Sequence, residues 1–347
     1  MKVLHLIQSN RFSGAENMVC QIVAMMADNP DIEMAYCSKD GQIRDALEER
    51  NIKFFPLKKL SASEVKKVIK EYRPDIIHTH DMAASFTGAL ACGRIPLIAH
   101  IHGNHLNSRK ISPKSVAFLW TALKAKHIFW VSKSALAQYK FSAFVKSKSS
   151  VLYNIIDIES LYKKMELDTN TYNYDIAYVG RLTFPKNPER LVNVIAKAVE
   201  KKPDLKVAVI GTGDLEGNAK RLAQQMGLNS NIDFLGFQSN PLKALHSAKV
   251  MIMTSRYEGT PMCALESLAL GTPIVSTPTD GLCELIENGV NGYLSDDDDE
   301  LAQRLFEIVQ NSTLEENLSN NAKNMAFEQN RTDLYKEKLL KQYKINP

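Results

Sequence analysis

The stretch VMIMTSRYEGTPMCALESLALGTPIVS, residues 250–276, decides the fold class. Its apolar, β-branched ends predict buried strands at Val250 to Thr254 and at Pro273 to Ser276. Between them a helix is expected to begin near Thr260 and Pro261, because Thr can cap a helix and Pro suits its first turn. Two strands joined by one helix form a βαβ unit, in which the strands run parallel.

The same alternation continues on both sides of this unit. Amphipathic helical patterns, such as Asn187 to Lys201, separate the strand patterns. Further strands are expected at Lys2 to Ile7, Glu33 to Cys37, Phe54 to Leu57, Asp75 to His80, Pro96 to His102, His127 to Ser132, Ser150 to Asn154, Asp175 to Gly180, Lys206 to Gly211 and Ile232 to Leu235. The predicted fold class is therefore α/β, with parallel sheets covered on both faces.

One polar segment interrupts the alternation. Ile155 to Asn173 shows no strand pattern, and a chain of 347 residues is more than one core usually serves. We read this segment as a linker, with an N-terminal domain at 1–155 and a C-terminal domain at 174–327. Ligands of such sheets bind at the carboxyl ends of the strands, so the cleft between the domains is the expected site.

The composition is that of a soluble globular protein, with 44% hydrophobic and 24% charged residues. No run of about 18 apolar residues could span a membrane. The apolar start, Met1 to Ile7, is too short for a signal peptide, so a cytosolic location is expected. The five cysteines lack CxxC spacing and are expected to be reduced thiols.

Charge is spread unevenly along the chain. The net charge is +4, but no Asp or Glu lies between Asp81 and Asp157, and the stretch from Arg109 to Lys148 is basic. This favours an anionic partner. The helical pattern of Ile111 to Lys126 either lies on an anionic membrane surface or packs on the core with a basic solvent face. Nucleic acid is not expected, because no aromatic stacking platform accompanies the basic block.

Two carboxylates flank the predicted helix that begins near Pro261. Glu258 precedes the helix start, where free N–H groups suit phosphate oxygens, and Glu266 lies two turns further on. Both could accept hydrogen bonds from hydroxyls of a sugar and a ribose. The alternative is that they are ordinary acidic residues near a helix start and on a helix surface.

An ordered set of motifs accompanies this pair, and together they resemble the GT4-type family of retaining glycosyltransferases along nearly the whole chain. The Glu-x7-Glu pattern of Glu258 and Glu266 is followed by Leu270 to Val275. The other matching stretches are Ser13 to Glu16, His100 to Gly103, Val179 to Leu182 with Lys186 and Asn187, Ile210 to Asp214, and Asp280 to Leu294.

The resemblance implies a GT-B architecture, in which two Rossmann-like domains face each other across a cleft and a C-terminal helix, about 328–347, packs back onto the first domain. It also implies metal-independent transfer of a sugar from a nucleotide donor with retention of anomeric configuration. No cofactor or metal is expected, because Arg181 and Lys186 take the place of a cation.

Catalytic roles are implied for four residues. Arg181 and Lys186 would hold the departing diphosphate, Glu258 the hydroxyls of the transferred sugar, and His102 the sugar from the first domain. The expected donor-binding residues are Gly14, Gly211, Gly213, Gly259, Thr260, Pro261, Met262, Cys263 and Glu266, the last on the ribose. Surface bases, tight turns and a structural histidine are the plain alternatives for these positions.

Two other clusters are interpreted without a metal. His78, His80, His100 and His105 lack the spacing of a zinc set on one helix face, and no Cys or carboxylate completes one. The acidic run Asp296 to Glu300 contains DxD but precedes a helical pattern, so it is expected to cap a helix.

The function predicted from these residues is transfer of a hexosyl or N-acetylhexosaminyl group, most simply from a UDP-sugar, to a hydroxyl of a glycan or polyprenyl-linked acceptor. Bacterial surface polysaccharide assembly, at the inner face of the membrane, is the family-level context. A nucleotide-sugar epimerase of the same fold and a non-catalytic sugar-binding relative remain the alternatives.

Overall fold

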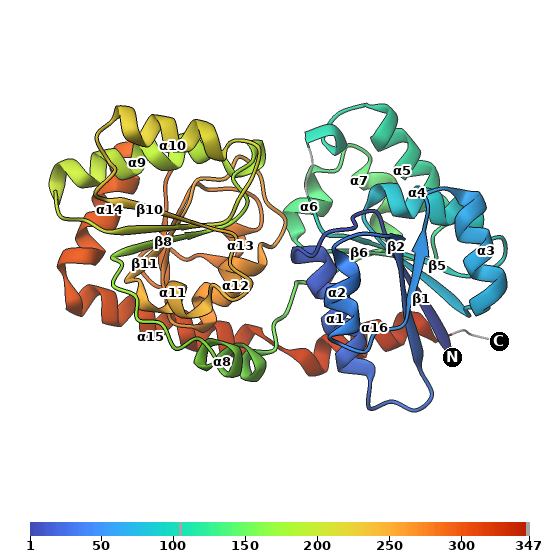
Figure 1. The fold of residues 1–347 in the computed structure, drawn as a ribbon. Coiled ribbons are helices and arrows are strands. Elements are labelled where there is room, and N and C mark those ends of the chain that lie inside the picture. The colour runs from blue at the N-terminus through green and yellow to red at the C-terminus, as the bar shows by residue number, and fades with distance from the viewer. Residues whose placement is uncertain (104–105, 345–347) are drawn as a thin grey trace. The chain divides into compact units, whose positions relative to one another are not determined.

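The computed structural model describes residues 1–103 and 106–344, so His105 lies outside the described residues. The chain forms two compact units (Figure 1). The first contains Met1–Ile155 and Thr332–Pro347, and the second contains Ile156–Arg331. Each is built on a parallel sheet with helices on both faces, as the alternation of strand and helix patterns predicts.

The first unit has a seven-stranded sheet in the order β3-β2-β1-β4-β5-β6-β7. Its central strands are almost completely buried, as expected for a sheet covered on both sides. They are β1 (Lys2–Ile7), β2 (Glu33–Lys39), β3 (Phe54–Leu57), β4 (Ile76–His80), β5 (Leu97–Ile101), β6 (His127–Trp130) and β7 (Ser149–Val151). The order reverses between β1 and β4, which defines the switch point of this sheet.

Four helices of the first unit begin at a small polar residue whose side chain caps them. Ser61, Asp81 and Ser132 each accept a backbone N–H at a helix start, and Ser112 forms a capping box with Ser115. The helices are α1 (Gly14–Met26), α2 (Ile43–Glu48), α3 (Ala62–Tyr72), α4 (Met82–Ala91), η1 (Leu106–Ser108), α5 (Pro113–Lys124), α6 (Lys133–Gln138), α7 (Ser142–Val145), η2 (Lys146–Lys148) and α16 (Thr332–Tyr343).

The second unit has a six-stranded sheet in the order β10-β9-β8-β11-β12-β13, with its switch point between β8 and β11. The strands are β8 (Ile176–Val179), β9 (Val207–Ile210), β10 (Ile232–Gly236), β11 (Val250–Met253), β12 (Ile274–Ser276) and β13 (Gly292–Leu294). The helices are α8 (Ile158–Glu166), η3 (Phe184–Lys186), α9 (Pro188–Lys201), α10 (Glu216–Gln225), α11 (Leu242–Ser247), α12 (Met262–Ala269), α13 (Leu282–Leu285), α14 (Asp298–Gln310) and α15 (Ser312–Gln329).

The segment expected to be a linker contains helix α8. Asp157 caps it by accepting the N–H of Ser160. Leu161 is buried, and the hydroxyl of Tyr162 donates to the carbonyl of Ala269 at 2.9 Å. The second unit therefore begins at Ile156, well before residue 174.

Helix α16 packs within the first unit although it closes the chain. Tyr335, Leu339 and Tyr343 are buried in one core cluster with Ile76 and Ile98 of the sheet. A break at residues 330–331 separates α16 from α15, so the C-terminal helix begins at Thr332 and not near residue 328. None of the helices in residues 1–103 and 106–344 has the length and hydropathy needed to cross a membrane.

Candidate active site

The switch point of the second sheet carries the predicted donor residues. The loop after β8 contains Lys186, and the loop after β11 contains Glu258. These two strands are direct neighbours in the sheet and run parallel, so both loops leave from the same edge. Crevices at such points are the usual ligand sites of open α/β sheets.

Lys186 and Glu258 form a nearly buried ion pair. The Lys186 Nζ lies 2.5 Å from the Glu258 Oε1, and their side chains are 15% and 10% exposed. The hydroxyl of Ser255 donates to the same oxygen at 2.6 Å. Burial has the largest single effect and lowers the pKa of Lys186, but Glu258, Cys263 and Tyr178 together raise it above its usual value. Lys186 is therefore a charged donor with hydrogens left for an anion.

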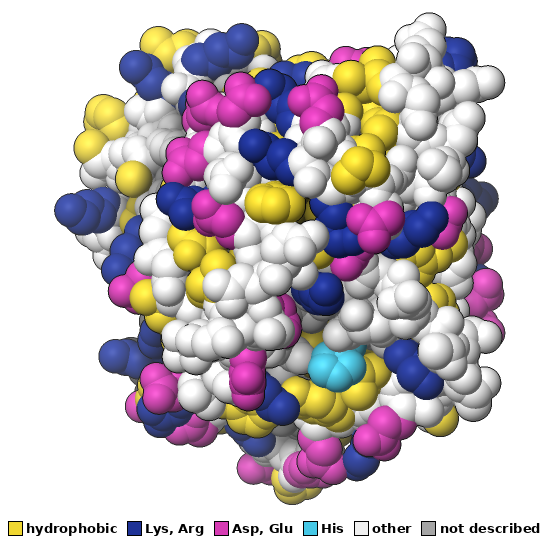
Figure 2. Space-filling view, turned by 90° about the vertical axis from the view of Figure 1, so that its left-hand side faces the viewer, with side chains coloured by type: hydrophobic (Ala, Val, Ile, Leu, Met, Phe, Trp, Pro, Cys, Tyr) yellow, Lys and Arg dark blue, Asp and Glu magenta, His cyan; other side chains and the backbone are white. Residues whose placement is uncertain are grey.

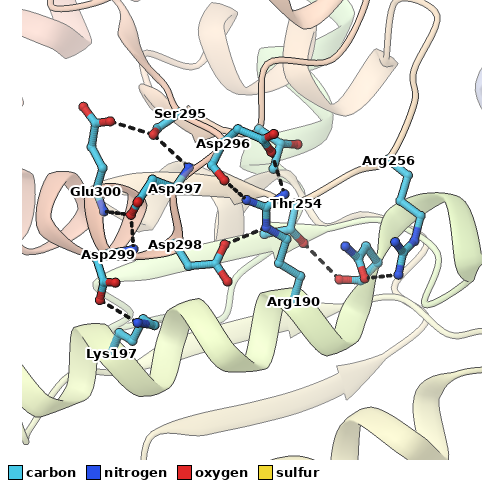
Figure 3. Close-up of polar contacts among 12 residues, drawn as sticks. Arg190, Lys197, Thr254, Arg256, Ser295, Asp296, Asp297, Asp298, Asp299 and Glu300 are labelled. Carbon is cyan, nitrogen blue, oxygen red and sulfur yellow. Dashed lines mark hydrogen bonds and ion pairs between the residues drawn. The ribbon is translucent and has the colours of Figure 1, made fainter.

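Contacts between the two loops hold this pair in place. The hydroxyl of Thr254 donates to the carbonyls of Lys186 and Asn187, and the Arg256 N–H donates to the carbonyl of Pro185 at 2.7 Å. The Arg256 guanidinium also donates to the side chain of Asn187 at 2.8 Å (Figure 3). The two loops therefore form one polar unit, which fixes the position of Lys186.

Helix α12 begins next to this pair, at Met262. Pro261 precedes it in an extended conformation, with ψ 127°, and no side chain caps the helix. The expectation that Thr260 caps a helix starting at Pro261 is therefore wrong, because Pro261 is not yet helical. The first turn of α12 still presents N–H groups without intrahelical acceptors, as every helix start does.

Glu266 lies on α12, one side of which faces the core. Burial raises the pKa of its carboxyl to about 7, and Lys164 offsets a part of this effect. Cys263, one turn earlier, has its pKa raised to about 11, also chiefly by burial. With this pKa, both protonation states of Glu266 are populated near neutral pH. The carboxylate can accept a hydrogen bond from a hydroxyl, and the protonated carboxyl can donate one to it.

Gly211 and Gly213 have a structural role that the sequence did not show. A Cβ on Gly211 would lie 2.0 Å from the carbonyl oxygen of Gly180, and one on Gly213 would lie 2.2 Å from that of Leu182. Gly211 also has a positive φ of 135°. These glycines let the loop after β9 pack directly on the loop after β8. The expectation from sequence was that they allow a base or ribose to approach.

A third glycine of this kind was missed. A Cβ on Gly281 would lie 1.5 Å from the carbonyl oxygen of Gly259, so the Gly281 loop packs on the backbone that follows Glu258. Nothing in the sequence distinguishes this glycine from one in an open turn. It belongs to the scaffold of the site.

Arg181 stands apart from the Lys186–Glu258 pair. Its side chain is exposed, and it forms no ion pair with any residue in the described part of the chain. Its carbonyl accepts the hydroxyl of Tyr178 at 3.1 Å, which fixes the backbone at the end of β8. The free guanidinium is available to an anion at this edge of the sheet.

The switch point of the first sheet carries Gly14 and an unpredicted carboxylate, Asp81. Gly14 begins α1, where the Ser13 hydroxyl donates to the buried Glu16 at 2.5 Å. Asp81 follows β4 with a positive φ of 123° and accepts the N–H of Gln8 at 3.0 Å. Burial raises the pKa of Asp81 to about 6. An Asp between a strand and a helix is a recognisable capping signal, but its strain and burial are not visible in sequence.

His102 follows β5 and is linked to another histidine of the first sheet. Its Nε2 lies 2.9 Å from the Nδ1 of His80. Burial lowers the pKa of His102 to about 3, and the Asn154 side chain offsets a part of this shift. The ring is therefore neutral at physiological pH, and it can serve a substrate as a hydrogen-bonding group.

Histidine nitrogens of the first unit come close enough to be considered as metal ligands. Two groups, His5 with His78 and His80, and His80 with His100 and His102, have nitrogens within 4.8 Å of one another. Neighbouring strands bring these rings together, whereas the expectation against zinc rested on helix spacing. The His5–His80 and His80–His102 nitrogens are 2.9 Å apart, closer than the about 3.3 Å between ligands of tetrahedral zinc. Hydrogen bonds describe these distances better.

The acidic run Asp296 to Glu300 caps and pins α14, which confirms its interpretation as a helix start (Figure 3). Asp297 accepts the N–H groups of Asp299 and Glu300. Arg190 of α9 pairs with Asp296 and Asp298, and Lys197 pairs with Asp299. These carboxylates are therefore committed to joining α14 to α9.

Two family models match the chain in succession. The model described as Glycosyltransferase Family 4 matches residues 12–160, and the model described as Glycosyl transferases group 1 matches residues 163–325. An uncharacterized glycosyltransferase of Methanocaldococcus jannaschii is 30% identical over 299 residues, which cover 78% of this chain and 75% of the relative.

Two further proteins are similar over nearly their whole length. One is the UDP-Gal:alpha-D-GlcNAc-diphosphoundecaprenol alpha-1,3-galactosyltransferase of Escherichia coli. It is 24% identical over 324 residues, which cover 85% of this chain and 84% of the relative. The structure of HepE of Anabaena in complex with UDP and glucose has a TM-score of 0.87 at 21% identity, with 98% of both chains covered. The chain therefore belongs to the GT4-type family of glycosyltransferases and has the GT-B fold.

Proposed function

We propose that this glycosyltransferase transfers a hexosyl or N-acetylhexosaminyl group from a UDP-sugar to a hydroxyl of a glycan or polyprenyl-linked acceptor, with retention and without a metal. The observation that carries the proposal is the Lys186–Glu258 ion pair at the switch point of the second sheet. A fixed cation beside a fixed carboxylate at this switch point supports a site for an anionic sugar donor.

The donor is held by groups of opposite character. Lys186, the free guanidinium of Arg181 and the first N–H groups of α12 bind the diphosphate and offset its charge as it leaves. Glu258 accepts hydroxyls of the transferred sugar, and Glu266 accepts those of the ribose. Sugar hydroxyls suit these carboxylates, since a carboxylate accepts several hydrogen bonds at once.

Retention follows in this proposal from a front-face reaction. Glu258 is engaged by Lys186 and Ser255, so it serves as a bound acceptor of hydrogen bonds and not as a free nucleophile. The acceptor hydroxyl then attacks from the side on which the diphosphate departs, and the diphosphate oxygen takes its proton. His102 contributes a hydrogen bond to the sugar.

The choice of donor and acceptor draws on the relatives. The Escherichia coli relative is named for a UDP-sugar donor and a diphosphoundecaprenol acceptor, and the Anabaena structure contains UDP and glucose. These names support uridine as the base and a lipid-linked glycan as the acceptor, in surface polysaccharide assembly.

Helix α5 supports action at an anionic membrane surface on the cytoplasmic side. Its inner face buries Phe118, while Val116, Trp120 and Leu123 are 48%, 36% and 61% exposed. The ammonium of Lys124 lies 4.1 Å from the centre of the Trp120 ring. The helix therefore packs on the core and still exposes an apolar, basic strip. Such a strip suits an anionic membrane surface. The face shown in Figure 2 differs from this strip of α5, because basic and acidic side chains are interspersed on it.

Turnover tests the function directly. The protein is incubated with UDP-sugars and lipid-diphosphate sugars, with and without EDTA, and the anomeric proton of the product is followed by NMR. Transfer with retention in EDTA supports the proposal. An epimerised donor would indicate the epimerase alternative, and no turnover with any donor would favour the non-catalytic one.

A further inference from the structure

Five histidines form one layer on a single face of the first sheet. In the strand register His5 pairs with His78 and His80 pairs with His100, so their side chains share a face. His102 continues the same alternation beyond β5. The first four rings are fully buried, which is rare for so many polar side chains.

Three of these rings form a hydrogen-bonded chain. The His5 Nδ1 lies 2.9 Å from the His80 Nε2, and the His80 Nδ1 lies 2.9 Å from the His102 Nε2. At the buried end, the His5 Nε2 lies 3.4 Å from the sulfur of Met34. At the other end, the Nδ1 of half-buried His102 is itself buried and hydrogen-bonds to none of the described residues.

Each ring in this chain carries a single proton. Burial lowers the pKa of His5 and His102 to about 3 and lowers that of His80 well below its usual value. A neutral imidazole has one N–H and one acceptor nitrogen. Each hydrogen bond of the chain needs an N–H on one ring and an acceptor nitrogen on the next. All three rings therefore carry the proton on Nδ1, or all three carry it on Nε2.

Met34 distinguishes the two arrangements. A thioether sulfur can accept a weak hydrogen bond but cannot donate one. With protons on Nε2, His5 donates to Met34, His80 donates to His5, and His102 donates to His80. With protons on Nδ1, the lone pair of His5 Nε2 faces the lone pairs of the sulfur, which is unfavourable. The His102 Nδ1 has no hydrogen-bond partner among the described residues, so Asn154 does not fix the tautomer.

We infer that the chain Met34–His5–His80–His102 is a positioning relay that fixes the proton of His102 on Nε2 and so presents its Nδ1 to the donor sugar as an acceptor. His5 and His80 are positioning residues, and the relay makes His102 select a hydroxyl or N–H group on the sugar. The role of His102 in sugar binding rests on the proposed function, but its tautomer does not.

The tautomer is measured directly on the free protein. With ¹⁵N-labelled histidine, two-bond ¹⁵N–¹H correlation spectra distinguish protonated from unprotonated ring nitrogens, and single substitutions assign the rings. We expect His5, His80 and His102 to carry their protons on Nε2 at neutral pH. A proton on the Nδ1 of His102, or Zn²⁺ bound in stoichiometric amount by these rings, would overturn the relay.

A matched set of variants tests whether His80 and Met34 set the tautomer of His102. His80→Leu removes the acceptor of His102 and should release its tautomer, whereas His80→Asn keeps an acceptor oxygen in that place and should retain it. Met34→Leu conserves volume and should weaken the preference without unfolding the protein. His100→Gln is the control, because the His100 ring lies 4.1 Å from His102, centre to centre, but hydrogen bonds to none of the described residues.

Kinetics separate the relay from the proposed function. His80→Leu should lower kcat/KM for the donor by about tenfold, as expected for one lost hydrogen bond, while UDP affinity stays unchanged and His80→Asn restores the rate. An unchanged His102 tautomer in folded His80→Leu would overturn the relay. An altered tautomer with unchanged kcat/KM would leave the relay intact and remove His102 from the proposed site.

Discussion

At the residue scale, the Lys186–Glu258 pair joins stability to activity. Removing one partner of a buried pair leaves the other charge uncompensated, at a cost of about 3–5 kcal/mol. Lys186→Met should therefore lower both the melting temperature and the transfer rate, the latter by about 100-fold, as for loss of a charge-stabilising group. Thermal unfolding and initial rates measure the two effects.

The double variant Lys186→Met with Glu258→Gln is the control for this prediction. It removes both charges, so much of the lost stability should return while activity stays low. If the double variant recovers its rate together with its stability, the pair is structural only and the proposed catalytic role is wrong.

Glu266 should make stability depend on pH. Burial raises its folded-state pKa from 4.5 to about 7, so the protonated form is favoured by folding. Its contribution is therefore fully present below pH 4.5 and is lost as pH rises through about 7. The melting temperature of Glu266→Gln relative to wild type should rise over this window. A constant difference between pH 4.5 and 8 would contradict the shifted pKa.

The sequence points to individual residues of the candidate site but not to the contacts that these residues make. Lys186 and Glu258 were both selected, but the contact between them depends on strand order, which no local pattern contains. Asp81 was missed as a half-buried carboxylate with a positive φ of 123°, because no local sequence pattern indicates this backbone conformation. Which of the predicted residues, Lys186 and Glu258 included, touch a substrate stays a prediction.

At the element scale, strands with buried, β-branched patterns were predicted well, even the three-residue strand β12. Strand β13 was missed, because its three residues lie at a sheet edge and include a glycine and no β-branched residue. Helix α8 was assigned to a linker although Ile158, Leu161, Tyr162 and Met165 have helical spacing. Its polar composition outweighed that spacing in the prediction.

The glycines after β9 give a test at this scale. Gly211→Ala forces a Cβ toward the Gly180 carbonyl at a positive φ, so it should destabilise the second unit by at least about 1–3 kcal/mol. Gly217→Ala is the matched control in α10, where only Arg221 comes within 4 Å, and it should be neutral or stabilising by about 0.5 kcal/mol. Equal effects in urea unfolding would show that close packing of these loops does not matter.

At the scale of the whole molecule, the chain passes between its units at residues 155–156 and 331–332. The Asn330 side chain accepts the N–H of Ile156 at 2.9 Å and donates to its carbonyl at 2.7 Å. These two hydrogen bonds hold the two connecting segments of the chain together within the second unit. The C-terminal helix α16 then completes the core of the first unit, so that unit is built from both ends of the chain.

A pair of tyrosines on α16 tests this anchoring. The hydroxyl of Tyr343 is 2.7 Å from the Nδ1 of buried His78, whereas that of Tyr335 has no partner within the described part of the chain. Tyr343→Phe should cost about 1–3 kcal/mol, because it leaves a buried nitrogen unsatisfied. Tyr335→Phe should be neutral or stabilising. Chemical unfolding of the first unit measures both, and the reverse ranking would contradict the structure.

The most direct test of the donor site is calorimetric titration of UDP into wild type, Glu266→Gln and the control Glu189→Gln, each with and without EDTA. Glu189 is exposed on α9 and has no part in the proposed site. We expect UDP to bind the wild type equally well with and without EDTA, to bind Glu266→Gln about tenfold more weakly, and to bind Glu189→Gln as it binds the wild type. Absence of UDP binding to wild type, or its loss in EDTA, would contradict the account.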